Sequence, residues 1–369
     1  MRNIVGQLQT HLGRRPGRRL VRRLVTRLVP VMLAASVSVA AQVPLRPATA
    51  AETATDPDFA IWLEGVRTEA REKGIAESVI REALTGIEPV RRVVQRDRNQ
   101  SEFKLTYQIY RDRLLTDTNI RVGQAKRQQH DDLLSRVAQK YGVQPRFILA
   151  IWGMETRYGA VKPTMPVIPA VATLAYDRRR SAYFRRELFQ ALSMIDRGYI
   201  THAEMLGSWA GAMGQPQFMP SSYMAYAQDF DGDGRRDIWG NTGDVFASIA
   251  NYLARHGWRD DQTWGRQVQL PAEPGFIAAL PSRGKSSGCR AIDNMTDDLR
   301  LSEWQAQGVR RADGRDLPTR DLPASLVRPD GSDGPAFLVY RNYQSILRYN
   351  CAHLYGLAVS QLADRIAGR

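Results

Sequence analysis

The segment Phe147–Gly159, FILAIWGMETRYG, is the feature that most restricts how this chain can fold. Pro145, just before it, suits the first turn of a helix because its missing N–H would be unpaired there, and Gly159 is a natural stop. Helical spacing of i, i+3, i+4 and i+7 puts four residues on one face: Ile148, Ile151, Trp152 and Glu155. Three of these are apolar, so the pattern predicts a helix that carries a carboxyl group on its buried face.

A carboxyl group in such a place has two interpretations. Burial beside Trp and Ile disfavours the charged form, so the pKa of Glu155 should rise and the group should be protonated near neutral pH, as a general acid requires. Alternatively, Glu155 is structural, and it hydrogen-bonds a backbone amide or pairs with an arginine such as Arg157. The helix pattern alone does not decide between them.

A second informative stretch is Gly207–Gln228, whose 22 residues include no Asp, Glu, Lys, Arg or His. It is rich in neutral hydrogen-bonding groups and rings, such as Ser208, Gln217 and Phe218, and its glycines let a backbone approach a ligand closely. Neutral amides and hydroxyls interleaved with aromatic rings are typical of a sugar-binding groove. The alternative is a glycine-rich packed turn.

An acidic loop follows directly, with Asp229, Asp231 and Asp233 at positions 1, 3 and 5 of an EF-hand-like pattern and Gly234 at position 6. Position 12 should be a bidentate Glu but is Gly240, and the next acid is Asp244. Three aspartates this close repel one another without a cation, so we expect a structural ion, Ca²⁺ or Na⁺. An Asx-rich turn without an ion is the alternative.

Residues 1–50 have the pattern of an export signal. They hold nine arginines and no acidic residue, and an apolar run over residues 28–41 leads to the small residues Ala48-Thr49-Ala50. We expect cleavage near Ala50 and a soluble periplasmic protein; a retained amphipathic anchor is the alternative. Without a cysteine near the cleavage region, we expect no lipid anchor.

The rest of the chain has 43 basic and 38 acidic residues, a net charge of +5, which gives no argument for nucleic acid but suits an anionic polymer. Its two cysteines, Cys289 and Cys351, are an even pair in an exported chain, so we expect a disulfide. Two free buried thiols are the alternative.

The chain order predicts a mainly α fold (α+β). Residues 51–140 form a helical N-terminal domain, with a helix over 124–141, and residues 141–262 form the core with the EF-hand-like loop. Short alternating segments separated by Asp-Gly turns predict a small, mainly β subdomain over 263–341. Residues 342–369 return to helix.

The order of these motifs closely resembles the lytic murein transglycosylase B family over roughly residues 56–369. The motifs are WGMETRYG, GSWAGAMGQPQFMPSSY, the DxDGDG loop that leads into Ile249-Ala250-Asn251-Tyr252, and Arg348-Tyr349-Asn350. The resemblance implies a lysozyme-like α core. It matches Glu155 to the sole acid and base. It implies that the groove is lined by Ser208, Gln217, Phe218, Tyr252, Tyr349 and Tyr355.

The resemblance also implies that Arg179 and Arg180 meet the peptide stem, although Asp177-Arg178 stand where the family often has Tyr-Pro. It matches the loop ion to Asp229, Asp231, Asp233, the carbonyl of Arg235, and Asp244, with one extra residue before Asp244.

The implied activity is non-hydrolytic cleavage of the β-1,4 bond between N-acetylmuramic acid and N-acetylglucosamine in peptidoglycan, which leaves a 1,6-anhydro end and needs no cofactor for the chemistry. An ordinary glycosidase pairs its acid with a second carboxylate, and Gly207–Gln228 offers none. The alternatives are a hydrolytic lysozyme-type muramidase and a non-catalytic peptidoglycan-binding module. We expect a monomer whose partners are glycan strands and, in addition, cell-wall synthesis or division proteins.

Overall fold

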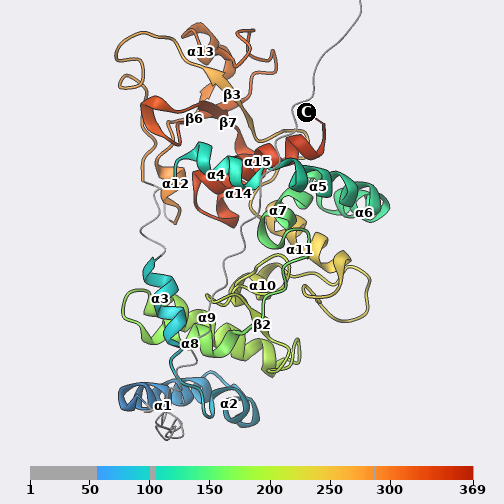
Figure 1. The fold of residues 1–369 in the computed structure, drawn as a ribbon, viewed down its shortest axis with the longest axis vertical. Coiled ribbons are helices and arrows are strands. Elements are labelled where there is room, and N and C mark those ends of the chain that lie inside the picture. Colours follow the sequence, from blue (N-terminus) through green and yellow to red (C-terminus); the bar gives the residue numbers. More distant parts are fainter. Residues whose placement is uncertain (1–55, 100–104, 286–287, 369) are drawn as a thin grey trace, which may run out of the picture. The chain divides into compact units, whose positions relative to one another are not determined.

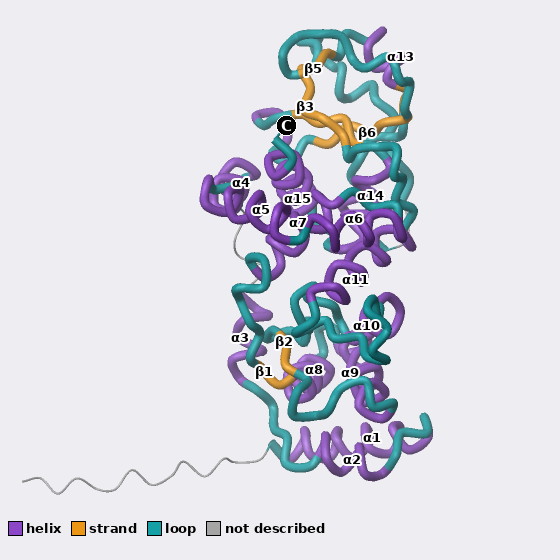
Figure 2. The backbone as a smooth tube through the Cα atoms, turned by 90° about the vertical axis from the view of Figure 1, so that its right-hand side faces the viewer, coloured by secondary structure: helices purple, strands orange, loops and turns teal. Residues whose placement is uncertain are grey.

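The computed structural model describes residues 56–99, 105–285 and 288–368, so the expected signal peptide lies outside the described residues. The expectation of a mainly α chain with a small β subdomain is confirmed (Figure 1; Figure 2). The helices up to the catalytic candidate are α1 (Pro57–Glu72), α2 (Glu77–Leu84), α3 (Arg91–Asn99), α4 (Tyr107–Leu114), α5 (Asp117–Gln129), α6 (Asp131–Tyr141) and α7 (Pro145–Thr156). The later ones are α8 (Val167–Tyr176), α9 (Ser181–Asp196), α10 (Pro220–Tyr226), α11 (Thr242–Arg255), α12 (Arg290–Asp293), α13 (Leu301–Ala306), α14 (Arg341–Tyr349) and α15 (His353–Ile366), with a 3₁₀ turn, η1 (Gly331–Asp333).

Two apolar cores divide the helices. One combines α4–α7 with α11, α14 and α15, and Phe147, Ile148 and Ile151 lie at its centre, fully buried. The other combines α1–α3 with α8–α10. The cores therefore run across the expected boundary at residue 140, because α4–α6 pack on the later helices while α1–α3 pack on α8 and α9. The described chain from residue 56 onward forms one compact unit.

The helix expected over residues 124–141 is two helices in the structure, divided at His130. His130 caps α5 by donating its backbone N–H to Lys126 O (3.1 Å). A new helix begins at Asp131 and Asp132, whose carboxylates are favourable at a helix N-terminus. The apolar spacing continues across the break, so periodicity alone could not reveal it.

The β subdomain is built on a five-stranded antiparallel sheet of order β4-β6-β7-β3-β5, separate from the two-stranded β1 (Met165–Pro166) and β2 (Leu206–Gly207). Its strands are β3 (Gly265–Gln269), β4 (Leu299–Arg300), β5 (Arg310–Arg311), β6 (Pro323–Val327) and β7 (Ala336–Val339). Successive residues of β7 face opposite sides. Phe337 and Val339 join the first helical core, whereas Ala336 and Leu338 join a small core that includes Trp304. The sheet is thus covered on both faces.

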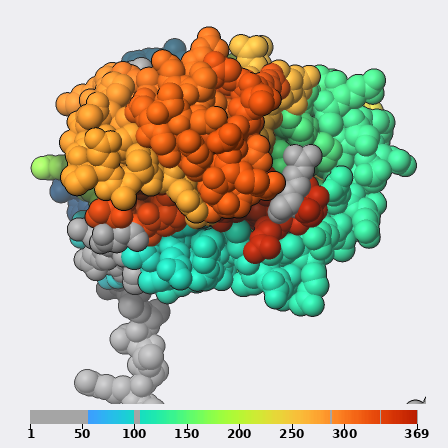
Figure 3. Space-filling model, turned by 90° about the horizontal axis from the view of Figure 1, so that it is seen from above, coloured from blue at the N-terminus to red at the C-terminus, as the bar shows by residue number. Residues whose placement is uncertain are grey.

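The subdomain is held against the helices after residue 105 by specific contacts. The Tyr107 ring meets Phe337 with centroids 5.5 Å apart, and the Tyr107 N–H donates to Asp330 Oδ1 at 2.7 Å. The space-filling view shows this neighbourhood, with the orange subdomain beside the teal helices (Figure 3).

The C-terminal segment, expected as one helical stretch from residue 342, is broken into α14 and α15 at residues 350–352. Cys351 lies in this break and forms the expected disulfide with Cys289, at a Cα–Cα distance of 5.5 Å. Within the described residues, no helix has the length and the apolar run that a membrane crossing requires.

Candidate active site

Helix α7 carries the candidate acid at its end. The helix begins at Pro145, as predicted, and its residues from Arg146 to Gly153 are all buried. Glu155 is the penultimate helical residue and is only part buried, so its carboxyl group lies where the apolar helix reaches the surface of the core. The end of a rigid, buried helix is a position from which a side chain can be aimed accurately.

The helix stops at Thr156, before the predicted Gly159, because three successive residues take the left-handed conformation. Arg157, Tyr158 and Gly159 have φ values of 50°, 59° and 79°. Two non-glycine residues in this region store strain, which is held by contacts. The Tyr158 ring packs edge-on against Trp152 (5.7 Å between centroids), and its hydroxyl donates to Asn119 O at 3.0 Å. The turn therefore locks the end of α7.

The carboxyl group of Glu155 has one described protein partner. The hydroxyl of Tyr355, from α15, donates to Glu155 Oε1 at 2.6 Å, and no other described residue hydrogen-bonds the second oxygen, Oε2. Burial raises the pKa of Glu155 to about 7, although the Tyr355 hydrogen bond acts in the opposite direction. The negative end of the α7 dipole also disfavours the ionised form. Near neutral pH, a large fraction of the group is protonated.

Tyrosines surround this acid. The ring of Tyr349 lies 4.8 Å from that of Tyr252, and Phe218 packs against both at 5.7–5.8 Å. Burial raises the pKa values of Tyr349 and Tyr355 well above normal, and the nearby charge of Glu155 adds to this. The acid is therefore enclosed by rings that stay neutral. Phe218 is itself buried, 2% exposed, and backs these rings.

Tyr110 of α4 also belongs to this wall and was not predicted. Its pKa is raised by burial and by the charge of Glu155. In the described part of the chain, Glu155 is the one carboxylate whose charge acts on Tyr110, Tyr349 and Tyr355. The only sequence signal was an aromatic residue in an amphipathic helix, which is not specific.

Ser208 and Gln217 lie on a tight hairpin formed by residues 207–218. Ser208 and Ala212 exchange hydrogen bonds (Ser208 N to Ala212 O, 2.7 Å; Ala212 N to Ser208 Oγ, 3.2 Å). Gln217 has a φ of 53°, and its Nε2 donates to Gly214 O at 2.9 Å. The Tyr349 hydroxyl donates to Pro216 O at 2.6 Å, which joins the hairpin to the tyrosine wall. The structure thus brings this hairpin to the residues around Glu155.

Gln215 connects the hairpin to α7, a role that the sequence did not predict. Its Oε1 accepts a hydrogen bond from Trp152 Nε1 (2.7 Å), and its Nε2 donates to Trp239 O (2.8 Å). Its backbone carbonyl accepts from Thr156 Oγ1 at 3.1 Å. Gly159 is needed beside it, because a Cβ there would lie 2.5 Å from Gln215 Oε1. This one side chain holds the end of the acid's helix against two loops.

The two arginines expected at the peptide stem form ion pairs within the protein. Arg179 and Arg180 both pair with the buried carboxylate of Asp97 in α3, and Arg180 also lies over the Phe184 ring. Their side chains remain 48% and 42% exposed, so each keeps an accessible face. The Asp97 partnership could not be read from the sequence, because 82 residues separate it from Arg179.

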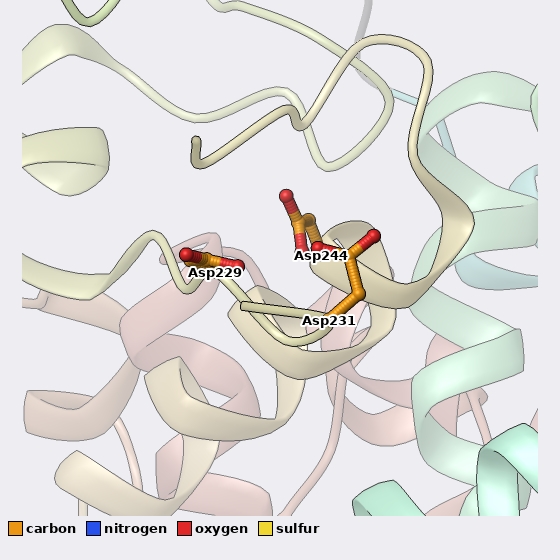
Figure 4. A group of neighbouring side chains, drawn as sticks. All are labelled: Asp229, Asp231 and Asp244. Atoms are coloured by element: carbon orange, nitrogen blue, oxygen red, sulfur yellow. The ribbon is translucent and has the colours of Figure 1, made fainter. Parts of the chain in front are cut away.

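Three of the expected metal ligands converge in the acidic loop. Oxygen atoms of Asp229, Asp231 and Asp244 lie within 4.8 Å of one another. Figure 4 shows these three side chains. Asp233 is not in this group; its Oδ1 accepts from Arg235 N at 2.8 Å. Gly232 and Gly234 supply the left-handed turns, with φ values of 81° and 86°. The loop is already folded around its carboxylates.

Asp244, at the start of α11, is the buried member of the group. Its two oxygens accept from Phe230 N and Asp237 N, both at 2.7 Å, and burial raises its pKa. Asp231 is exposed, and its pKa is lowered, mainly by the hydrogen bond from Asn241 Nδ2. A hard cation with oxygen ligands fits this donor set.

The site as a whole presents one protonatable carboxylic acid, a wall of neutral rings and a hairpin of amides and hydroxyls. Such a constellation is typical of the acid–base site of an enzyme.

The comparisons with known proteins agree. The family model described as a transglycosylase SLT domain matches residues 58–364. The chain belongs to this family. It is 36% identical over 264 residues to membrane-bound lytic murein transglycosylase B of Escherichia coli K12, covering 70% of this chain and 66% of that relative's length.

Solved structures share the fold. SltB3 of Pseudomonas aeruginosa, in complex with NAG-anhNAM-pentapeptide, is 40% identical with a TM-score of 0.76, covering 84% of this chain and 80% of that one. The E. coli lytic transglycosylase Slt35 in complex with calcium is 30% identical with a TM-score of 0.68, covering 84% of this chain and 93% of that one. The lysozyme-like, mainly α fold expected from the sequence is therefore confirmed.

Proposed function

We propose that this protein is a lytic transglycosylase that cleaves the β-1,4 bond between N-acetylmuramic acid and N-acetylglucosamine in peptidoglycan without using water. The observation that carries the proposal is the carboxyl group of Glu155. Burial raises its pKa to about 7, and among the described residues the Tyr355 hydroxyl is its one hydrogen-bond donor. The related SltB3 structure holds a NAG-anhNAM-pentapeptide, and this supports a glycan substrate.

In the first step, the proton on Glu155 Oε2 passes to the bridging oxygen as the bond from that oxygen to the muramic acid C1 breaks. The electron pair of the bond leaves with N-acetylglucosamine, and positive charge develops at C1. The Glu155 carboxylate formed in this way lies beside that charge. Tyr355 donates to it throughout, which keeps the carboxylate oriented.

In the second step, Glu155 takes the proton of the muramic acid 6-hydroxyl, and the 6-oxygen bonds to C1. The acid is regenerated, the product carries a 1,6-anhydro ring, and atoms balance without water. One group serves as acid and then as base, and a pKa near the working pH suits both tasks.

The neutral groups around Glu155 supply positioning. Ser208 and Gln217 offer a hydroxyl and an amide for sugar hydroxyls and acetamido groups, while Tyr252, Tyr349 and Tyr355 provide ring faces and edges. Phe218 supports these rings from behind. Arg179 and Arg180 keep exposed faces that can meet a carboxylate of the peptide stem.

The loop is proposed to hold a structural Ca²⁺ through Asp229, Asp231 and Asp244, with Asp233 and the Arg235 carbonyl as further ligands. Three converging carboxylates fit this ion, and the calcium complex of Slt35 supports the choice. The ion would offset the repulsion of the carboxylates and fix the start of α11; Na⁺ is a weaker fit to three carboxylates.

The site of action is proposed to be the periplasm, after removal of the first 50 residues. The disulfide between Cys289 and Cys351 supports an oxidising compartment.

Product analysis tests the function directly. Purified sacculi are digested with the protein, and the soluble muropeptides are measured by mass spectrometry. We expect 1,6-anhydro products, each lighter by one water molecule than its hydrolytic counterpart. Hydrolysed ends would instead establish a lysozyme-type muramidase, and binding without release of fragments would establish a non-catalytic module.

A further inference from the structure

A pocket of about 620 Å³ adjoins the far side of the Gln215 connection and has no part in the mechanism above. Its walls come from three loops: residues 159–164 at the end of the turn that follows α7, residues 199–206 before the hairpin, and residues 235–240 at the end of the acidic loop. Gly214 and Gln215 form its floor. It is therefore built on the same residues that hold the end of α7.

The pocket has an apolar part. Tyr199 and Trp239 contribute rings, and Ile200 and Leu206 contribute aliphatic surface. Val161, at the edge, is 48% exposed, which is unusual for a valine beside other apolar groups. The Trp239 ring is fixed, because its Nε1 donates to Leu206 O at 2.9 Å. The apolar surface is thus preformed.

The pocket also has an excess of unpaired positive charge. Lys162, Arg235 and Arg236 line it, and none of the three forms an ion pair with a carboxylate among the described residues. Arg236 is held over the Tyr199 ring, at 5.2 Å from its centroid. Cations that converge on a pocket without partners favour an anionic ligand.

The two carboxylates of the lining are already engaged. Asp237 Oδ1 accepts from Trp239 N and Gly240 N, both at 2.9 Å. Glu204 Oε2 accepts from Thr201 Oγ1 at 2.8 Å. By contrast, the hydroxyl of Tyr199 has no hydrogen-bond partner among the described residues. The groups left for a ligand are therefore three cations, one hydroxyl and an apolar wall.

We propose that this pocket binds a further carboxylate-bearing part of the peptide stem of peptidoglycan, apart from the carboxylate proposed to meet Arg179 and Arg180. The proposal rests on the proposed function. In peptidoglycan the lactyl carboxyl group of the glycan is used in the amide bond to the peptide, so the free carboxylates belong to the stem. A stem also alternates these carboxylates with alanine methyl groups, which match the apolar wall. A neutral glycan offers these cations no charge-assisted hydrogen bond, whereas a carboxylate does.

Binding of a free stem tests the proposal. The probe is the tetrapeptide L-Ala-γ-D-Glu-meso-diaminopimelate-D-Ala, titrated into the protein while the indole N–H signals are followed by NMR. We expect the Trp239 signal to shift. The same peptide with its carboxylates amidated should bind at least tenfold more weakly.

The charge is tested with the double variant Lys162→Gln/Arg236→Gln, which should bind the tetrapeptide about tenfold more weakly. The matched control Arg121→Gln/Arg255→Gln removes two exposed positive charges elsewhere, on α5 and α11, and should bind like the parent. Equal binding by both double variants, or by the amidated peptide, would overturn the proposal.

A conservative variant guards against misfolding. Tyr199→Phe keeps the ring under Arg236 and removes a hydroxyl without a described partner, so the melting temperature should not change. We expect it to weaken tetrapeptide binding severalfold. A Trp239 shift caused by an N-acetylglucosamine oligomer, without one from the peptide, would identify a glycan site and contradict the proposal.

Two readouts keep this proposal separate from the proposed function. Glu155→Gln should bind the tetrapeptide as the parent does, because Glu155 does not line the pocket. On sacculi, Lys162→Gln/Arg236→Gln should raise KM, whereas on glycan strands stripped of peptide it should match the parent. If the double variant and the parent had the same KM on both substrates, the pocket proposal would be wrong. The product analysis that tests the proposed function would not be affected.

Discussion

The end of α7 and the acidic loop both depend on carboxylates, yet they treat them in opposite ways. Glu155 is alone, has one hydrogen-bond donor, and has a raised pKa of about 7. Asp229, Asp231 and Asp244 are gathered together, and backbone N–H groups or Asn241 donate to their oxygens.

The difference shows that the role of a carboxyl group is determined by the residues around it. One donor in an apolar wall leaves a group that can exchange a proton. Several hydrogen-bond donors, together with a cation bound between the carboxylates, favour groups that stay ionised and fix the backbone. Removing Glu155 should therefore harm catalysis, and removing a loop aspartate should harm stability.

The largest effect is expected for Glu155→Gln. The variant keeps the shape of the side chain but cannot exchange a proton, so activity on sacculi should fall about 10³-fold. The melting temperature should stay equal to that of the parent or rise. Activity within tenfold of the parent, measured as muropeptide release, would remove Glu155 from the mechanism.

For Asp244→Ala, in contrast, we expect a loss of stability. It leaves the N–H groups of Phe230 and Asp237 without their acceptor, which should cost about 3 kcal/mol in the free energy of unfolding. Asp231→Asn is the matched control, because it removes a charge at an exposed position. Both variants should lose the rise in melting temperature that Ca²⁺ gives the parent. If neither Ca²⁺ nor a chelator changed the melting temperature of the parent, the proposed metal site would be contradicted.

The titration of Glu155 should make the free energy of unfolding depend on pH. Its pKa is about 7 in the folded protein and 4.5 when unperturbed, so the folded state holds the proton more tightly between these values. The contribution to stability is full below about pH 4.5 and is lost as pH rises through 7, by about 3 kcal/mol. Denaturant unfolding of parent and Glu155→Gln across this range measures it. Parallel curves for the two proteins would contradict the raised pKa.

The smallest effect is expected for Tyr355→Phe. It removes the hydrogen bond that favours the ionised carboxylate, so the pKa of Glu155 should rise further and the alkaline limb of kcat/KM should move to higher pH. Activity should fall about tenfold because the acid loses its orientation. Tyr349→Phe is the control, since that hydroxyl donates to Pro216 O. If both variants shifted the limb equally, Tyr355 would have no special role.

The sequence was sufficient to predict those features that depend on the spacing of nearby residues. It predicted that Glu155 shares a face with buried apolar residues and that aspartates converge in the loop after Gln228. It also predicted the disulfide from the count and the compartment. Each of these depends on residues close in sequence or on chemistry that leaves few choices.

The sequence could not show contacts between distant segments. Nothing in the sequence around Arg179 and Arg180 reveals that they meet Asp97, and nothing in α4 marks Tyr110 as a neighbour of Glu155. Gln215 is one of several neutral amides, and only its bonds to Trp152 and Trp239 distinguish it.

The hydrogen bond between Tyr355 and Glu155 joins residues 200 positions apart. A growing polypeptide therefore lacks the orienting hydroxyl until Tyr355 has been synthesised, and α15 must then dock on α7. Loop closure over such a span is a late folding event. A chain truncated before α15 would contain the acid without its partner, so the proposed acid is fully oriented only after α15 has docked.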